Sequence, residues 1–173
     1  MLEQAILIAV KCHARQSRKH TVGQQRLPYI THPMEVMKTV WAWGAGSPLL
    51  LAAAVLHDVL EDSRLIQKDL ARIFGNELAG IVRELTHDRK SDGDKGQYLQ
   101  RFATSSTPAL IVKLADRYCN LRDCRFTDPD RFQRYWEKSA LLIDIMRQRL
   151  PDVARDFGEE VARAIALAYE GLA

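Results

Sequence analysis

The sequence predicts an all-α protein, a bundle of about eight to ten helices. Apolar residues recur at spacings of three and four along most of the chain, and the alternation typical of strands is hard to find. Proline after Ser, Thr or Asp opens several of the periodic segments. The 173 residues are 47% apolar and 27% charged, which are ordinary globular values. We therefore expect one domain spanning residues 1–173.

The N-terminal part of the chain is expected to begin with two helices. The first covers Leu2–Gln16, where apolar residues share one face. Residues Ser17–Thr31 are polar and contain Gly and Pro, which indicates a loop. The second helix runs from His32 to about Trp43, with Pro33 in its first turn.

The third predicted helix has an unusual composition. Ser47 and Pro48 open it, and its body, Leu49–Leu56, is apolar on every side. A helix without a polar face is expected to be buried at the centre of the fold. This run is also the longest apolar stretch in the chain, and it is far short of the ~20 residues that a membrane helix needs.

The same rules predict the rest of the chain. A polar loop is expected at His87–Gly96. The further helices are expected over Gln67–Phe74, Asn76–Thr86, Gln97–Phe102, Ser106–Cys124, Asp128–Leu150 and Pro151–Leu172.

The end of the apolar third helix carries the first candidate site. Four ionisable residues, His57, Asp58, Glu61 and Asp62, follow directly on the apolar run. Burying such groups without partners costs several kcal/mol, so something must compensate, and a metal ion would do so. His57 and Asp58 are about 100° apart around a helix axis and can be neighbouring ligands. Taken alone, a His-Asp pair at a helix end is usually just a surface feature.

Two more residues extend this pattern. His32 stands at a loop-to-helix junction, and Asp116 emerges from an apolar stretch. Each alone has an ordinary interpretation, a capping histidine and an aspartate paired with Arg117. Together with His57 and Asp58, however, they supply two imidazoles and two carboxylates. This ligand set suits a divalent ion such as Mn²⁺, Fe²⁺ or Zn²⁺.

Four stretches resemble one known family. They are Ala9–Lys19 (AVKCHARQSRK), Pro28–Pro33 (PYITHP), Ala54–Asp62 (AVLHDVLED) and Val112–Arg122 (VKLADRYCNLR). In content, order and spacing they resemble motifs of the HD superfamily, and within it the hydrolase domain of the RelA/SpoT alarmone enzymes. The stand-alone small alarmone hydrolases are the most similar group. The resemblance implies an HD-domain helical bundle.

The resemblance also implies roles for individual residues. Glu61 and Asp62 look like the acidic pair that positions and activates the attacking water. Asn120 resembles a substrate-contacting asparagine, and Arg18 and Lys19 resemble a basic pair that contacts base or phosphate, although both basic residues could equally be solvated charge. One divalent metal, with Mn²⁺ first and Fe²⁺ or Zn²⁺ as alternatives, would be held by His32, His57, Asp58 and Asp116.

The reaction implied by the resemblance is hydrolysis of guanosine 3′,5′-bis(diphosphate) (ppGpp or pppGpp) to GDP or GTP and pyrophosphate. A bound metal lowers the pKa of its water and accepts charge from phosphoryl oxygens, which suits this chemistry. Bifunctional relatives carry a synthetase domain after the hydrolase domain, so we expect this chain only to degrade the alarmone. Two alternatives stay open: a broader nucleotide phosphohydrolase or NADPH phosphatase, and a non-catalytic alarmone-binding module.

Some features of the sequence depart from the family pattern, and others bear on the partners and cellular location of the protein. The Lys19–Pro28 segment is longer than in relatives, so Arg26 is an alternative to Arg18 and Lys19, and Asp123 stands where many relatives have threonine. The net charge of +3 does not favour nucleic acid as a partner. The three cysteines form no paired CxxC motif, and the N-terminus resembles no signal peptide. We expect a cytoplasmic protein with a small nucleotide substrate and no membrane association. The sequence does not predict an oligomeric state.

Overall fold

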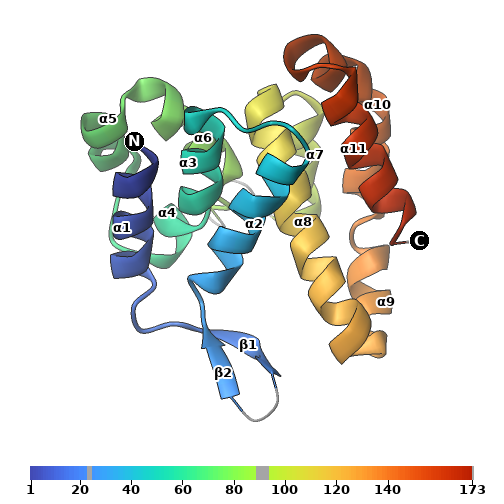
Figure 1. Cartoon of the computed structure of the whole chain (residues 1–173), viewed down its shortest axis with the longest axis horizontal. Helices are drawn as coiled ribbons and strands as arrows, with labels where there is room; N and C mark the ends of the chain where they lie inside the picture. The colour runs from blue at the N-terminus through green and yellow to red at the C-terminus, as the bar shows by residue number, and fades with distance from the viewer. Residues whose placement is uncertain (23–24, 89–93, 173) are drawn as a thin grey trace.

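The computed structural model describes residues 1–22, 25–88 and 94–172 (Figure 1). Their structure is almost entirely helical, which confirms the all-α prediction. A short 3₁₀ turn, η1, covers Arg101–Ala103, and two strands, β1 (Ser17–Val22) and β2 (Gln25–Pro28), form a hairpin. The helices are α1 (Leu2–Cys12), α2 (Thr31–Ala42), α3 (Pro48–Leu56), α4 (Val59–Asp62), α5 (Gln67–Phe74), α6 (Asn76–Leu85), α7 (Lys95–Gln100), α8 (Thr107–Thr127), α9 (Pro129–Glu137), α10 (Ala140–Phe157) and α11 (Glu159–Glu170).

Helix α3 is central, as its composition predicts. It begins where the Ser47 hydroxyl accepts a hydrogen bond from the Leu50 N–H at 3.2 Å, and it lies between α1 and α2 (Figure 1). Its opposite faces belong to two separate hydrophobic cores. One core, shared with α2, α8, α10 and α11, takes Leu50, Ala53 and Ala54. The other, shared with α1, α5 and α6, takes Ala52, Val55 and Leu56.

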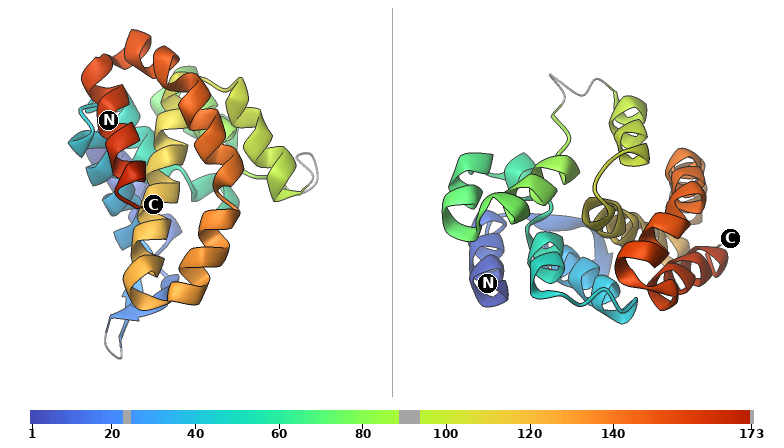
Figure 2. Two further views of the ribbon diagram at one scale, coloured as in Figure 1. Left: turned by 90° about the vertical axis from the view of Figure 1, so that its right-hand side faces the viewer. Right: turned by 90° about the horizontal axis from the view of Figure 1, so that it is seen from above.

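Helix α8 forms the axis of the C-terminal part. The Ser106 hydroxyl accepts from the Ala109 N–H at 3.3 Å and caps its first turn. The helix packs against α2 on one side and against α10 and α11 on the other (Figure 2). The Tyr169 hydroxyl of α11 donates to the Leu114 carbonyl of α8 at 2.8 Å. No helix in the described part of the chain has the length and apolar character to cross a membrane.

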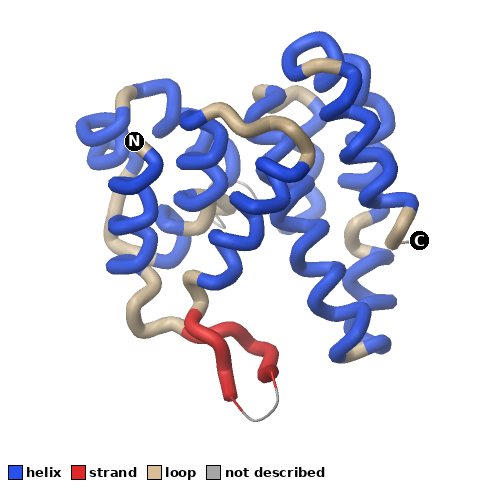
Figure 3. Tube along the Cα trace, in the orientation of Figure 1, coloured by secondary structure: helices blue, strands red, loops and turns tan. Residues whose placement is uncertain are grey.

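The loop predicted for Ser17–Thr31 is partly wrong. Strands β1 and β2 pair antiparallel there and project from the helical body (Figure 3). Thr21 pairs with Arg26 and Val22 with Gln25, with an irregularity between Ser17 and Thr21. Main-chain pairing rather than an alternating apolar pattern defines these two short strands.

Three of the predicted helices also have different bounds in the structure. The expected Asp128–Leu150 helix is broken at Ser139, whose hydroxyl donates back to the Tyr135 carbonyl at 2.6 Å. Pro151 does not begin the last helix; it lies inside α10. The break comes instead at Gly158, whose φ of +100° ends α10 in a conformation that residues with a Cβ rarely adopt. The first helix is shorter than expected and ends at Cys12.

Candidate metal centre and active site

Three segments of the fold meet at one cluster of side chains. His32 lies in the first turn of α2, His57 and Asp58 form the junction between α3 and α4, and Asp116 lies midway along α8. His32 Nε2 is 3.1 Å from Asp116 Oδ1, although the two residues are 84 positions apart. His57 Nε2 is 3.0 Å from Asp58 Oδ2 and 3.9 Å from Asp116 Oδ1. The structure therefore brings the four predicted ligands together.

The donor atoms are oriented as a cation site requires. His57 Nδ1 lies 2.8 Å from the Ala54 carbonyl and donates to it, so Nε2 is the nitrogen that faces the carboxylates. Burial alone would lower the pKa of His57, but Asp58 and then Asp116 raise it to about 9. Facing ligand atoms of His32, His57 and Asp58 all lie within 4.8 Å of one another, and this set of imidazole and carboxylate donors fits a divalent ion.

Neighbouring side chains hold the two carboxylates in place. The Tyr29 hydroxyl donates to Asp58 Oδ2 at 2.5 Å. Lys113 Nζ donates to Asp116 Oδ2 at 2.9 Å, and Asn120 Nδ2 donates to Asp116 Oδ1 at 2.6 Å. Such second-layer contacts orient metal ligands and tune their basicity.

Our sequence reasoning missed the parts played by Tyr29 and Lys113. The signal available was spacing, since each stands three residues before a predicted ligand. Asn120, predicted to contact substrate, is placed against Asp116 in this structure.

Glu61 and Asp62 lie just beyond the cluster, on the one-turn helix α4. Glu61 Oε1 accepts from the His87 N–H at 2.5 Å. Burial raises the pKa of Glu61 and that of Asp62, and the nearby Asp58 charge adds to both shifts. A carboxylate with a raised pKa is a better proton acceptor, which suits the predicted role in water activation.

A residue of the Ala9–Lys19 motif supports the main chain at Asp62. The Gln16 side chain donates to the Asp62 main-chain carbonyl at 3.2 Å, and its own Oε1 is 2.7 Å from His13 Nδ1. His13 is 2% exposed, and its ring centre lies 4.9 Å from that of Tyr29 with the two planes tilted by 47°. The Tyr29 N–H in turn donates to the Gln16 carbonyl at 3.0 Å. One network thus supports both Asp62 and, through the Tyr29 hydroxyl, Asp58.

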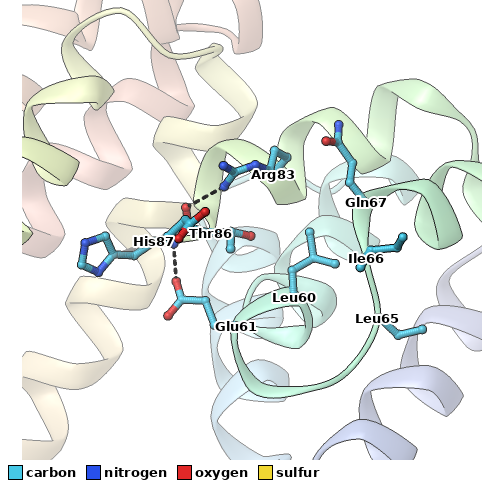
Figure 4. A pocket seen from close by; sticks show the side chains of 9 residues that line it. Leu60, Glu61, Leu65, Ile66, Gln67, Arg83, Thr86 and His87 are labelled. Atoms are coloured by element: carbon cyan, nitrogen blue, oxygen red, sulfur yellow. Dashed lines mark hydrogen bonds between the residues drawn. The ribbon is translucent and has the colours of Figure 1, made fainter. Parts of the chain in front are cut away.

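Glu61 also borders a pocket of about 410 Å³ that extends toward α5 and α6. Leu60, Ile66, Arg83 and His87 are among its lining residues. Figure 4 shows Glu61 at the edge of this pocket, with the His87 ring turned away from it. The pocket therefore gives solvent access to the Glu61 side of the site.

Arg18 is not placed as a free substrate contact. It is 8% exposed, donates to Glu35 Oε2 at 2.8 Å, and also forms an ion pair with Asp123. Asp123, the unusual negative charge in the sequence, is therefore matched by Arg18. Arg26 stays exposed on β2, and the side chain of Lys19 falls outside what the structure describes.

A protein-family model described as "HD domain" matches residues 5–151 of the chain. The chain belongs to the HD-domain family. In this HD-domain protein, His32 and Asp116 come from two different helices and meet His57 and Asp58 at the α3–α4 junction.

Several relatives with known names show which enzymes of the family this chain is similar to. A fruit fly (Drosophila melanogaster) protein named guanosine-3′,5′-bis(diphosphate) 3′-pyrophosphohydrolase MESH1 is 33% identical over 144 residues, 78% of each chain. The human (Homo sapiens) protein of that name is 33% identical over 150 residues, 82% of each chain. A solved structure, described as a metazoan ortholog of SpoT that hydrolyzes ppGpp, superposes with a TM-score of 0.75 at 25% identity, covering 98% of this chain and 94% of its own. The resemblance to stand-alone alarmone hydrolases is confirmed.

Proposed function

We propose that this HD-domain protein is a metal-dependent guanosine 3′,5′-bis(diphosphate) 3′-pyrophosphohydrolase. The observation that carries the proposal is the convergence of His32, His57, Asp58 and Asp116, with Glu61 and Asp62 one turn away. Relatives that bear this activity in their names share 30–33% identity over most of their length, which supports the same substrate class here.

We propose Mn²⁺ as the metal, held by those four residues. Two carboxylates and two imidazoles make a mixed set of oxygen and nitrogen ligands. Such a set suits a borderline divalent ion better than it suits Mg²⁺ or Ca²⁺. When bound, the metal would lower the pKa of a water and withdraw charge from phosphoryl oxygens. Lys113 and Asn120 fix the Asp116 carboxylate for this task, and Tyr29 fixes that of Asp58.

The remaining steps belong to residues around the ligands. Glu61 and Asp62 accept the proton of the attacking water, and the raised pKa of both carboxyl groups favours this transfer. Glu35 and Asp123 hold the terminal nitrogens of Arg18, and we propose that the face of this guanidinium contacts the nucleotide base. Lys19 follows it in β1 and is proposed to contact phosphate.

The experiment is a substrate panel combined with elemental analysis. Purified protein loaded in turn with Mn²⁺, Fe²⁺ or Zn²⁺ is assayed with ppGpp, pppGpp, GTP and NADPH, and the products are separated by ion-exchange chromatography. We expect GDP or GTP and pyrophosphate, with the highest turnover on the two alarmones. Preference for NADPH or an ordinary nucleotide would reject the proposed substrate. Tight alarmone binding without turnover under every metal would favour the non-catalytic alternative.

A further inference from the structure

Arg117 is a buried cation that has no anionic partner among the described residues. It lies on α8, and only 8% of its surface is exposed. Among the described residues, no carboxylate lies within ion-pair distance of its guanidinium and no acceptor takes a hydrogen bond from it; Nε in particular is buried without a partner. A buried, unpaired charge costs several kcal/mol, so folded proteins normally supply a counter-charge.

The side chains around Arg117 are aromatic and neutral. Its guanidinium carbon lies 4.5 Å from the centre of the Tyr135 ring of α9. Burial raises the pKa of Tyr135 and that of Tyr169 on α11, and the Arg117 charge opposes both shifts only in part. Both phenols therefore keep their protons at neutral pH. The stacking on Tyr135 is favourable, but it leaves the positive charge uncompensated.

A second cation lies one turn earlier on the same helix. Residues four apart share a helix side, so Lys113 and Arg117 are neighbours on α8. Lys113 Nζ is 2.9 Å from Asp116 Oδ2 and 5.1 Å from the centre of the Tyr98 ring. Asp116, the carboxylate that Lys113 contacts, is a proposed metal ligand. With a divalent ion balancing the two ligand carboxylates, Lys113 and Arg117 would remain as two positive charges beside the reacting centre.

We propose that Lys113 and Arg117 form the binding site for the diphosphate group that the reaction releases, an inference that rests on the proposed hydrolase function. An ammonium and a planar guanidinium next to each other match the several oxygens of a diphosphate. In the reaction, the oxygen of water bonds to the phosphorus next to the ribose, the bond from that phosphorus to O3′ breaks, and O3′ takes up a proton. The two cations hold the phosphate oxygens while this bond breaks.

The test measures binding of inorganic pyrophosphate to the metal-loaded protein by isothermal titration calorimetry. Loss of charge-assisted hydrogen bonds in Arg117→Met should weaken pyrophosphate binding by about 10- to 100-fold. Affinity for GDP, which lacks the 3′ diphosphate, should stay unchanged. Because methionine removes an unpaired buried charge, the Tm should rise by about 2–4 °C rather than fall.

Arg125→Met is the matched control. Arg125 is also on α8, with its guanidinium carbon 5.9 Å from the centre of the Phe132 ring of α9, but it donates to the Gly171 carbonyl at 2.6 Å. Its replacement should leave pyrophosphate affinity unchanged. Arg117→Lys, which keeps the charge, should retain most of that affinity.

Several results would overturn the site. Wild-type pyrophosphate affinity in Arg117→Met would do so, and with a lower Tm it would assign Arg117 to packing on Tyr135. An equal loss of GDP affinity would mean that the wrong phosphate group was assigned. If Arg117→Met does not fold, Arg117→Gln is measured in the same way; failure of both would show that the fold itself needs the charge. Absence of ppGpp turnover in the wild type, with pyrophosphate still bound, would reject the proposed function and not this site.

Discussion

Replacing Tyr29 by phenylalanine should weaken metal binding without disturbing the fold. The Tyr29 hydroxyl donates to Asp58 Oδ2 at 2.5 Å, and this hydrogen bond joins it to a proposed ligand. Phenylalanine keeps the ring and therefore its packing between His13 and His32. The variant thus removes one hydrogen bond and little else.

The magnitude follows from the charge and exposure of the pair. A hydrogen bond to a charged group is worth about 1.5–3 kcal/mol when both partners are buried. The Asp58 side chain is 20% exposed, so water replaces part of the lost bond. We therefore expect the lower end of that range, about 1.5 kcal/mol, which raises the metal Kd about tenfold.

The assay is competition for Mn²⁺ against a fluorescent chelator, with circular dichroism as the check on folding. Tyr118→Phe is the control, because it removes a phenolic hydroxyl from α8 that contacts no proposed ligand. An unchanged metal Kd in Tyr29→Phe would refute the claim that Tyr29 orients Asp58. An equal weakening in Tyr118→Phe would point to a general effect on stability.

Three further predictions concern the same site. Asp62→Asn should lower kcat by about 10²- to 10⁴-fold while metal content by elemental analysis stays the same; unchanged turnover would remove Asp62 from the mechanism. Gln16→Met should lower kcat by up to about 100-fold with KM and metal content unchanged, because the Asp62 carbonyl loses its donor. The control is Gln4→Met, at an exposed position on α1, and equal kcat values in the two variants would contradict the supporting role of Gln16. In the metal-free protein, burial lowers the pKa of His57 but its carboxylate neighbours raise it to about 9, so metal must displace a proton below that pH. Metal affinity should therefore rise about tenfold per pH unit from about pH 6 to about pH 8, with about one proton released in calorimetry across buffers; a pH-independent Kd would exclude this displacement.

Helix starts were the most predictable part of the fold. Ser47-Pro48, Ser106 with Pro108, and Asp128-Pro129 each open a helix in the structure, because a side-chain oxygen satisfies a free N–H and proline needs none there. The same rule failed at Pro151, because the surrounding apolar residues pack well enough for α10 to continue through it. Propensity is overridden where tertiary packing is strong.

The candidate site was predictable in residue type and only partly in geometry. Polar groups emerging from apolar helices identify His57, Asp58 and Asp116 without a structure. Arg18 could not be placed in this way, because its partners Glu35 and Asp123 are remote in sequence. The unpaired state of Arg117 was equally invisible, since the sequence lists charges but not the distances between them.

The position of α3 between two cores gives its alanines a role beyond filling space. Ala53 faces one core and Ala52 the other, and both are fully buried. A larger residue at either position would push the helix toward the opposite core and carry His57 and Asp58 with it, away from His32 and Asp116. The distances between the ligands therefore depend on the side-chain volumes at Ala52 and Ala53, which lie one to two turns before His57 and Asp58. A lineage that altered the size of either core would have to compensate in the other to keep the four ligands in register.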